Sequence, residues 1–193
     1  AEGDVKAQAL RDAQGWITNQ GGIEKVKMGY NNGGFGGGAT PGNFSVTSTD
    51  FSFFDMTDIN AHSKGSMGIV FDGRYIYFAP GYYNDGAGAI ENGFVTRYDT
   101  TGLFSTTSSW SFFDSSTVDA DAKGFIGATF DGRYVYLVPY WGNKNHVTRY
   151  DTTGSFTAVG SWSVFDTTAI NANSKGFTGA VFDGRYVYFV PHY

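Results

Sequence analysis

A ten-residue phrase with the pattern FDGRYxYxxP occurs three times in this chain of 193 residues. The copies lie at Phe71–Pro80, Phe130–Pro139 and Phe182–Pro191. Their starts are 59 and then 52 residues apart, and the flanking sequence repeats as well. Copies this similar within one chain predict a fold that is built by repeating one supersecondary unit.

Each repeat is expected to contain four antiparallel strands. In the middle repeat, alternating aromatic and β-branched residues predict strands at residues 124–130, 133–138, 146–150 and 162–165. An Asp-Gly pair at Asp131 predicts a tight hairpin between the first two strands, because glycine readily adopts a positive φ. Pro139 is expected to end the second strand. The extra residues of the first repeat fall between its second and third strands, where a loop can accept them.

The repeats at the two ends of the chain are incomplete. The chain stops after the second strand of the last repeat. Near the N-terminus, Lys25–Met28 resembles a third strand, and Phe51–Phe54 resembles a fourth strand. We therefore expect three four-stranded units of about 52 residues, with the N-terminal strands closing the last one and reducing the exposed sheet edges.

The chain divides into two segments of different composition. Residues 1–42 contain a predicted short helix beginning at Asp4 and a glycine-rich loop from Gly29 to Gly42, and could tether the protein to a larger structure. Residues 43–193 form the repeat β domain.

Four antiparallel strands in about 50 residues are typical of a propeller blade. The segment Arg149–Thr152 with Trp162 downstream resembles the kelch pattern, in which a Tyr-Asp pair precedes a strand tryptophan. This likeness covers residues 43–193, although the glycine pair of kelch strands is absent. The repeat phrase, FDGRYVYFVP in its last copy, itself resembles one found in uncharacterised secreted bacterial and phage proteins. The resemblance implies a propeller-like module and supplies no activity.

Three blades are fewer than the roughly four to eight of closed propellers. Two copies joined head to tail, each lending half a blade, would make a six-bladed ring. A single chain could instead close with threefold pseudosymmetry as a β-trefoil or β-prism. The sequence leaves both arrangements open.

Composition excludes several function classes. There is no cysteine, which excludes disulfides and thiolate chemistry. The net charge is −5, and the basic residues are scattered, so no nucleic-acid partner is expected. No apolar run approaches the roughly 18–20 residues of a membrane span. The chain begins with a small residue and no methionine, which fits an extracellular, cell-surface or virion location.

Catalytic signatures are weak, and neither catalytic residues nor a cofactor is predicted. The three histidines occupy non-equivalent repeat positions, so no shared metal site is expected. The recurring Asp-Gly acids are predicted to form turns, and the recurring arginines are predicted to pair with acids between neighbouring repeats. Oxygen-rich loops at Asp55–Gly65 and Asn84–Asn92 are minor candidates for calcium.

The repeats differ most in the residues that follow each proline, which are rich in aromatic side chains. The candidate ligand-binding residues are Tyr82, Tyr83, Tyr140, Trp141, Asn143, His192 and Tyr193. Aromatic faces stack on sugar rings, while amides and carboxylates bind hydroxyl groups. The same aromatics could simply pack the sheet ends or a subunit contact.

These features predict a non-enzymatic extracellular or virion-surface module that binds a glycan or a protein surface through loops on one face. The alternative is a secreted glycan-active enzyme on a propeller scaffold, which would need a pair of carboxyl groups in a pocket.

Overall fold

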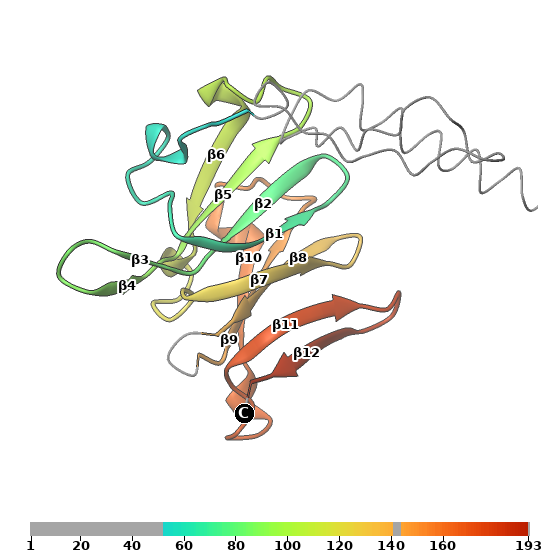
Figure 1. Ribbon diagram of the computed structural model, residues 1–193. Helices are drawn as coiled ribbons and strands as arrows, with labels where there is room; N and C mark the ends of the chain where they lie inside the picture. The colour runs from blue at the N-terminus through green and yellow to red at the C-terminus, as the bar shows by residue number, and fades with distance from the viewer. Residues whose placement is uncertain (1–51, 141–143, 193) are drawn as a thin grey trace, which may run out of the picture. The chain divides into compact units, whose positions relative to one another are not determined.

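The computed structural model describes residues 52–140 and 144–192, which contain strands, turns and short 3-10 helices (Figure 1). This part of the chain is all-β, as predicted. Of the described residues, 55–99, 107–140 and 144–192 form one compact body. Residues 52–54 and 100–106 belong to a separate unit, in which the Phe54 and Phe104 rings meet edge to face. The predicted N-terminal helix and glycine-rich loop lie outside the described residues.

Two repeats form four-stranded antiparallel sheets whose strands follow in chain order. The first repeat has the order β1-β2-β5-β6 and the middle repeat β7-β8-β9-β10, while the last repeat has β11 and β12. The strands of the first repeat are β1 (Ser66–Phe71), β2 (Tyr75–Pro80), β5 (Phe94–Asp99) and β6 (Trp110–Asp114). Those of the middle repeat are β7 (Phe125–Phe130), β8 (Tyr134–Pro139), β9 (His146–Asp151) and β10 (Trp162–Asp166). Those of the last repeat are β11 (Phe177–Phe182) and β12 (Val187–Pro191).

Short 3-10 helices connect the repeats and the outer strands. Three of them follow an aspartate whose carboxylate accepts a hydrogen bond from the backbone N–H two residues on, as Asp114 does from Ser116 at 3.0 Å. These three are η2 (Met56–Asp58), η4 (Ser115–Thr117) and η7 (Thr167–Ala169). Two others, η3 (Thr107–Ser109) and η6 (Val159–Ser161), lead into β6 and β10.

The extra residues of the first repeat fold into a small hairpin between β2 and β5. Its strands are β3 (Tyr82–Asn84) and β4 (Ala89–Glu91), which pair only with each other. The insertion therefore lies where the repeat spacing predicts it.

The Asp-Gly phrase is a self-contained hairpin. Asp131 Oδ1 accepts hydrogen bonds from the backbone N–H of Arg133 at 2.8 Å and of Tyr134 at 2.6 Å. The Tyr136 hydroxyl donates to Asp131 Oδ2 at 2.9 Å, and Gly132 has a φ of +99°. The same bonds recur at Asp72 and Asp183. The phrase thus encodes the turn, and its second tyrosine ties the turn to the strand.

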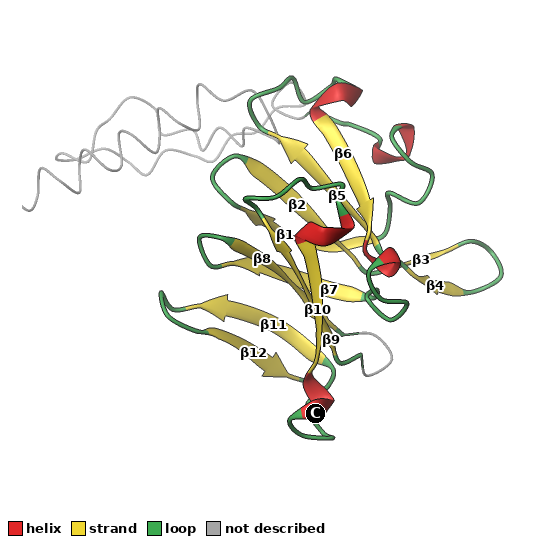
Figure 2. Ribbon diagram, turned by 180° about the vertical axis from the view of Figure 1, so that it is seen from behind, coloured by secondary structure: helices red, strands yellow, loops and turns green. Residues whose placement is uncertain are grey.

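The repeats lie side by side in a row (Figures 1 and 2). The innermost strand of the middle repeat, β7, contacts β1 on one side and β11 on the other. Gly68 allows the close approach of β1 to β7, since a Cβ there would lie 2.7 Å from the Gly127 Cα. The described strands form open sheets. They do not form the closed barrel that a β-trefoil would require.

Aromatic rings form the core between the first and middle repeats. Phe113 stacks on Trp162 with ring centroids 4.5 Å apart. Tyr77 lies 5.9 Å from Tyr150 and 6.0 Å from Phe156 by the same measure. All five side chains are at most 6% exposed, so this interface is closed to water.

Two expectations are not met in the described residues. Residues 52–54, expected in a fourth strand, belong to no strand, and Lys25–Met28 lie outside the described range. The last repeat therefore has two strands here, instead of four. Arg74 and Arg133 form their ion pairs within a repeat rather than between repeats: Arg133 Nη2 lies 2.7 Å from Asp151 Oδ2, because β8 and β9 are neighbours in one sheet.

Candidate functional site

An equivalent backbone hydrogen bond holds the residue after each proline. In each repeat this N–H donates to the carbonyl of a glycine that precedes the first strand. The bonds are Gly81 to Gly65 at 3.0 Å, Tyr140 to Gly124 at 3.1 Å and His192 to Gly176 at 2.8 Å. The three post-proline loops therefore leave the same end of their sheets.

Tyr83 is held by side chains of its own repeat. Its hydroxyl lies 2.9 Å from Nδ1 of His62, whose ring stacks on Phe94 at 4.9 Å. The Lys64 ammonium lies 4.5 Å from the Tyr83 ring centroid, which is a cation–π distance. One face of the Tyr83 ring is thus already in contact with Lys64. The other aromatic candidate of this repeat is Tyr82, which is half-buried and pairs with Glu91 in the β3–β4 hairpin.

Tyr140 and His192 come together from the middle and last repeats. Their ring centroids are 5.1 Å apart, and the planes are nearly perpendicular at 89°. Tyr140 is half-buried and His192 is exposed. The remaining predicted residues, Trp141, Asn143 and Tyr193, lie outside the described residues.

A charged bridge that sequence reasoning missed lies beside these loops. Lys144 Nζ is 2.8 Å from Asp121 Oδ1 and 3.2 Å from Glu91 Oε2. Burial opposes the charge of Lys144, but the two carboxylates outweigh it and raise the lysine pKa. The hydrogen bond from Lys144 lowers the pKa of Asp121. Lys144 thus ties the β3–β4 hairpin to the loop before β7.

The first repeat has an amide where the middle repeat has this lysine. Asn92, equivalent to Lys144, is buried and donates to the carbonyls of His62 at 2.9 Å and Lys64 at 2.6 Å. The two repeats thus differ at Lys144, and they also differ at Asp121, which stands where the first repeat has His62. These two differences are the sequence signal that could have revealed the bridge.

Three ligand-type groups gather on the same side of the middle repeat. Oxygen atoms of Asp119 and Asp121 and a ring nitrogen of His146 all lie within 4.8 Å of one another. The His146 Nδ1 lies 3.1 Å from the Asn145 amide oxygen, and the Asn145 amide donates to Asp166. These residue types can coordinate a metal ion, but the Lys144 ammonium already binds Asp121, so we assign no metal to this cluster.

The two minor calcium candidates use their oxygens locally. Asn84 Oδ1 accepts from the Gly86 N–H at 2.8 Å, and Asp85 Oδ1 accepts from Ala87 at 2.9 Å. Asp55 Oδ1 accepts from the Thr57 N–H at 2.9 Å. These bonds account for the polar residues in the loops as turn and cap formers.

The pKa shifts of the acids do not resemble those of a general acid. Within the described residues, every carboxyl group with a shifted pKa has it lowered. Burial opposes ionisation of Asp131, but the bonds from Tyr134, Arg133 and Tyr136 outweigh it. For Asp151 the main cause is the hydrogen bond from Arg133. The others are Asp55, Asp121, Asp166 and Asp183. A general acid needs the opposite shift.

No helix within the described part of the chain is long and apolar enough to cross a membrane. Comparison with protein-family models, curated proteins and solved structures finds no match to this chain. The resemblance carried by the FDGRY phrase therefore stays a prediction.

Proposed function

We propose that this chain is a non-enzymatic binding module of an extracellular, cell-surface or virion assembly, and that its repeats are propeller-type blades. The four-stranded sheets in chain order and the row of innermost strands β1, β7 and β11 support the blade interpretation. The module engages its ligand through the loops that follow the three prolines.

The observation that carries this proposal is the repeated backbone bond at Gly81, Tyr140 and His192. It fixes three loops of variable sequence at one end of a rigid, repeated scaffold, which is where repeat proteins commonly bind partners. The contact between the Tyr140 and His192 rings joins two of these loops into one surface.

A glycan is the ligand class that this surface fits best. Tyr82 and the Tyr140–His192 pair offer flat apolar rings, and Lys144 with Glu91 adds charged groups beside them. Several weak contacts from adjacent repeats would add up through avidity on a polymeric ligand.

Glycan-array binding with matched variants tests the proposal. We expect the wild-type chain to bind a subset of glycans, and Tyr140→Ala and Tyr82→Ala each to weaken binding at least about tenfold, a loss of about 1.4 kcal/mol. Tyr186→Ala is the control, because Tyr186 is 52% exposed but belongs to the Asp-Gly turn at the other end of the strand. Binding that is unchanged in both loop variants, or no binding to any glycan, would contradict glycan recognition by this face.

A further inference from the structure

The contact between the first and middle repeats shows how one repeat covers the next. The outward face of β2, β5 and β6 carries Tyr77, Arg97 and Phe113. Phe156 and Trp162 of the middle repeat cover it: Trp162 stacks on Phe113 at 4.5 Å, and Phe156 lies 4.2 Å beneath the Arg97 guanidinium. The covering side chains come from the third and fourth strands of the next repeat and from the segment between them.

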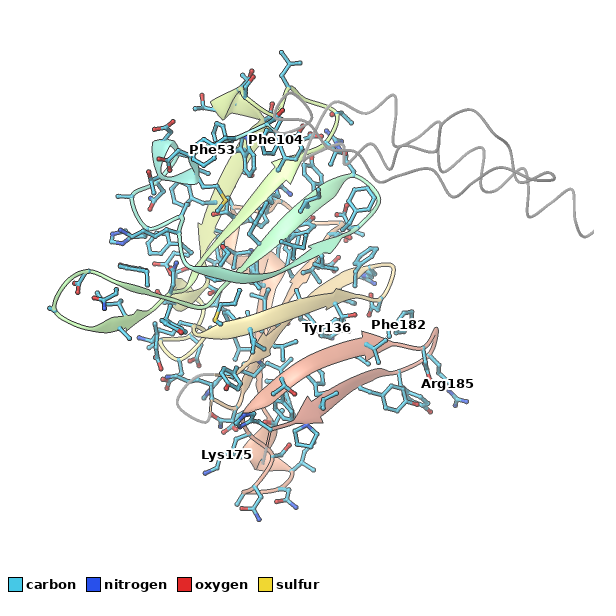
Figure 3. The ribbon with its side chains drawn as sticks, viewed as in Figure 1. Phe53, Phe104, Tyr136, Lys175, Phe182 and Arg185 are labelled. Atoms are coloured by element: carbon cyan, nitrogen blue, oxygen red, sulfur yellow. The ribbon has the colours of Figure 1, made fainter. Side chains whose placement is uncertain are left out.

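The equivalent face of the middle repeat lines an open cavity of about 480 Å³ instead. Its walls repeat the residues of the covered interface, with Tyr136, Arg149 and Phe165 in the places of Tyr77, Arg97 and Phe113. Val187 and Phe189 of β12 form the opposite wall. Tyr136 points toward the space between β8 and the β11–β12 hairpin (Figure 3).

Equivalent residues have very different exposure at the two places. Phe113 is 6% exposed in the covered interface, whereas Phe165 is 51% exposed beside the cavity. Arg149 is already oriented as Arg97 is, since its Nε donates to Ser163 at 2.9 Å and its guanidinium lies over Tyr134 at 4.4 Å. The cavity therefore has the walls of a repeat interface, and no residue in the described part of the chain stands in the places of Phe156 and Trp162.

The strand edge beside the cavity is also incomplete. In the first two repeats the second strand pairs with a third, as β2 does with β5 and β8 with β9. Among the described strands, β12 pairs with β11 alone. A peptide that adds strands to the β12 edge would place its side chains over the cavity.

One segment of the chain has the sequence of the missing fourth strand and of the turn before it. Gly42-Asn43-Phe44, followed by FSFFD from Phe51 to Asp55, resembles Gly154-Ser155-Phe156 followed by WSVFD from Trp162 to Asp166, with one residue more between the two parts. Phe44 therefore stands in the place of Phe156, and Phe51 stands in the place of Trp162.

The order of the repeats indicates that this segment comes from another copy. Asp55 leads through η2 directly into β1, at one end of the row of innermost strands, while β11 and β12 lie at the opposite end (Figure 1). A segment joined to the β1 end of a second copy can reach the cavity of the first. A closed dimer forms when each copy donates its segment to the other.

We propose that the N-terminal segment of a second copy of this chain completes the last repeat. Lys25–Met28 adds the third strand at the β12 edge, and Phe51–Asp55 adds the fourth, which places Phe44 and Phe51 in the cavity. Two copies then hold six four-stranded units, within the roughly four to eight of closed propellers. Within residues 52–140 and 144–192 of one chain the last repeat is incomplete.

Disulfide trapping tests both the contact and the identity of the donor, because the chain contains no cysteine of its own. Chains carrying only Phe51→Cys are mixed with chains carrying only Phe165→Cys, exchanged at low concentration and then oxidised. We expect a covalent species of twice the chain mass of 20.9 kDa that contains one of each variant. Ser52→Cys in place of Phe51→Cys is the control, since Ser52 is exposed and successive residues of a strand point to opposite faces.

The wild-type chain gives a second readout that needs no variant. By light scattering we expect about twice 20.9 kDa, falling toward the monomer on dilution, and Phe165→Asp is expected to shift the species to monomer while the far-ultraviolet circular dichroism stays that of a β protein. A wild-type chain that is monomeric at every concentration overturns the proposal. So does a crosslink that forms only within a single chain carrying both cysteines, which would assign the cavity to the chain's own segment.

Discussion

The hairpins of the middle and last repeats, Phe125–Pro139 and Phe177–Pro191, have the same register and the same irregularity after their first residue. Their burial is nevertheless different. Val138 is fully buried, whereas its equivalent Val190 is 52% exposed. The difference comes from the neighbours: β11 lies against β7 and β8, while the outward face of β12 has no neighbouring sheet among the described residues. One sequence phrase therefore determines the hairpin, and the adjacent repeat determines what the hairpin buries.

The largest difference between the two hairpins is expected for the paired truncations Val138→Ala and Val190→Ala. The first removes buried methyl groups and should lower the free energy of unfolding by about 2 kcal/mol. The second acts at a half-exposed site and should cost less than about 0.5 kcal/mol. Chemical denaturation at low protein concentration measures both. Equal costs would show that the last repeat is covered in solution.

A smaller difference is expected for Asp131→Asn and Asp183→Asn. Both aspartates accept two backbone N–H bonds and one tyrosine hydroxyl, but Asp131 is half-buried and Asp183 is exposed. Asp131→Asn should cost about 1 to 2 kcal/mol, because hydrogen bonds to a charged acceptor are strong where water cannot replace them. Asp183→Asn should cost less. A larger effect at Asp183 would contradict the exposure of the last hairpin.

The same carboxylates link stability to acid. Because folding lowers the pKa of Asp131, its contribution is present above the unfolded value of about 4 and is lost as pH falls through the folded value. Thermal unfolding between pH 7 and pH 3 should show this loss in the wild-type chain and a weaker loss in Asp131→Asn. A pH profile identical in the two proteins would remove Asp131 as a cause.

A third paired change should act equally on both hairpins. Gly132 and Gly184 both have a φ of +99°, and a Cβ at either would meet open space. Replacing either by alanine should cost about 1 kcal/mol, since the backbone strain is local to the turn. Thermal denaturation of the two variants measures it. Unequal costs would mean that neighbouring repeats also shape the turn.

The smallest effect is expected for Arg133→Ala. Its ion pair with Asp151 lies at the surface, with 58% of the arginine side chain exposed, so water and salt screen it. The melting temperature should change little, and its dependence on added salt should decrease. The decrease should equal that in Arg74→Ala, the matching change in the first repeat. A large loss in one of them alone would show that the two repeats use this pair differently.

Local patterns made much of this fold predictable. Alternating aromatics and the Asp-Gly turn predicted the strands of the middle repeat to within one residue at each end, because both signals act over a few neighbouring residues. The hydrogen bond from Tyr136 to Asp131 was not predicted, since it depends on the twist of the finished hairpin.

The candidate site was less predictable. The aromatic loops were noticed as a group, but only folding brings Tyr140 against His192 and places Lys64 over Tyr83. The Lys144 bridge joins residues 23 and 53 positions away in sequence, at Asp121 and Glu91, and no short-range pattern reports such contacts.

The sequence by itself determined that the chain is an all-β repeat protein, where its turns lie and where its insertion falls. Those features follow from backbone preferences and side-chain alternation within each phrase. The tertiary structure alone decided which identical residues are buried and which remain exposed. Burial is a property of neighbouring sheets, so Val138 and Val190 could not be told apart before the repeats were placed beside one another.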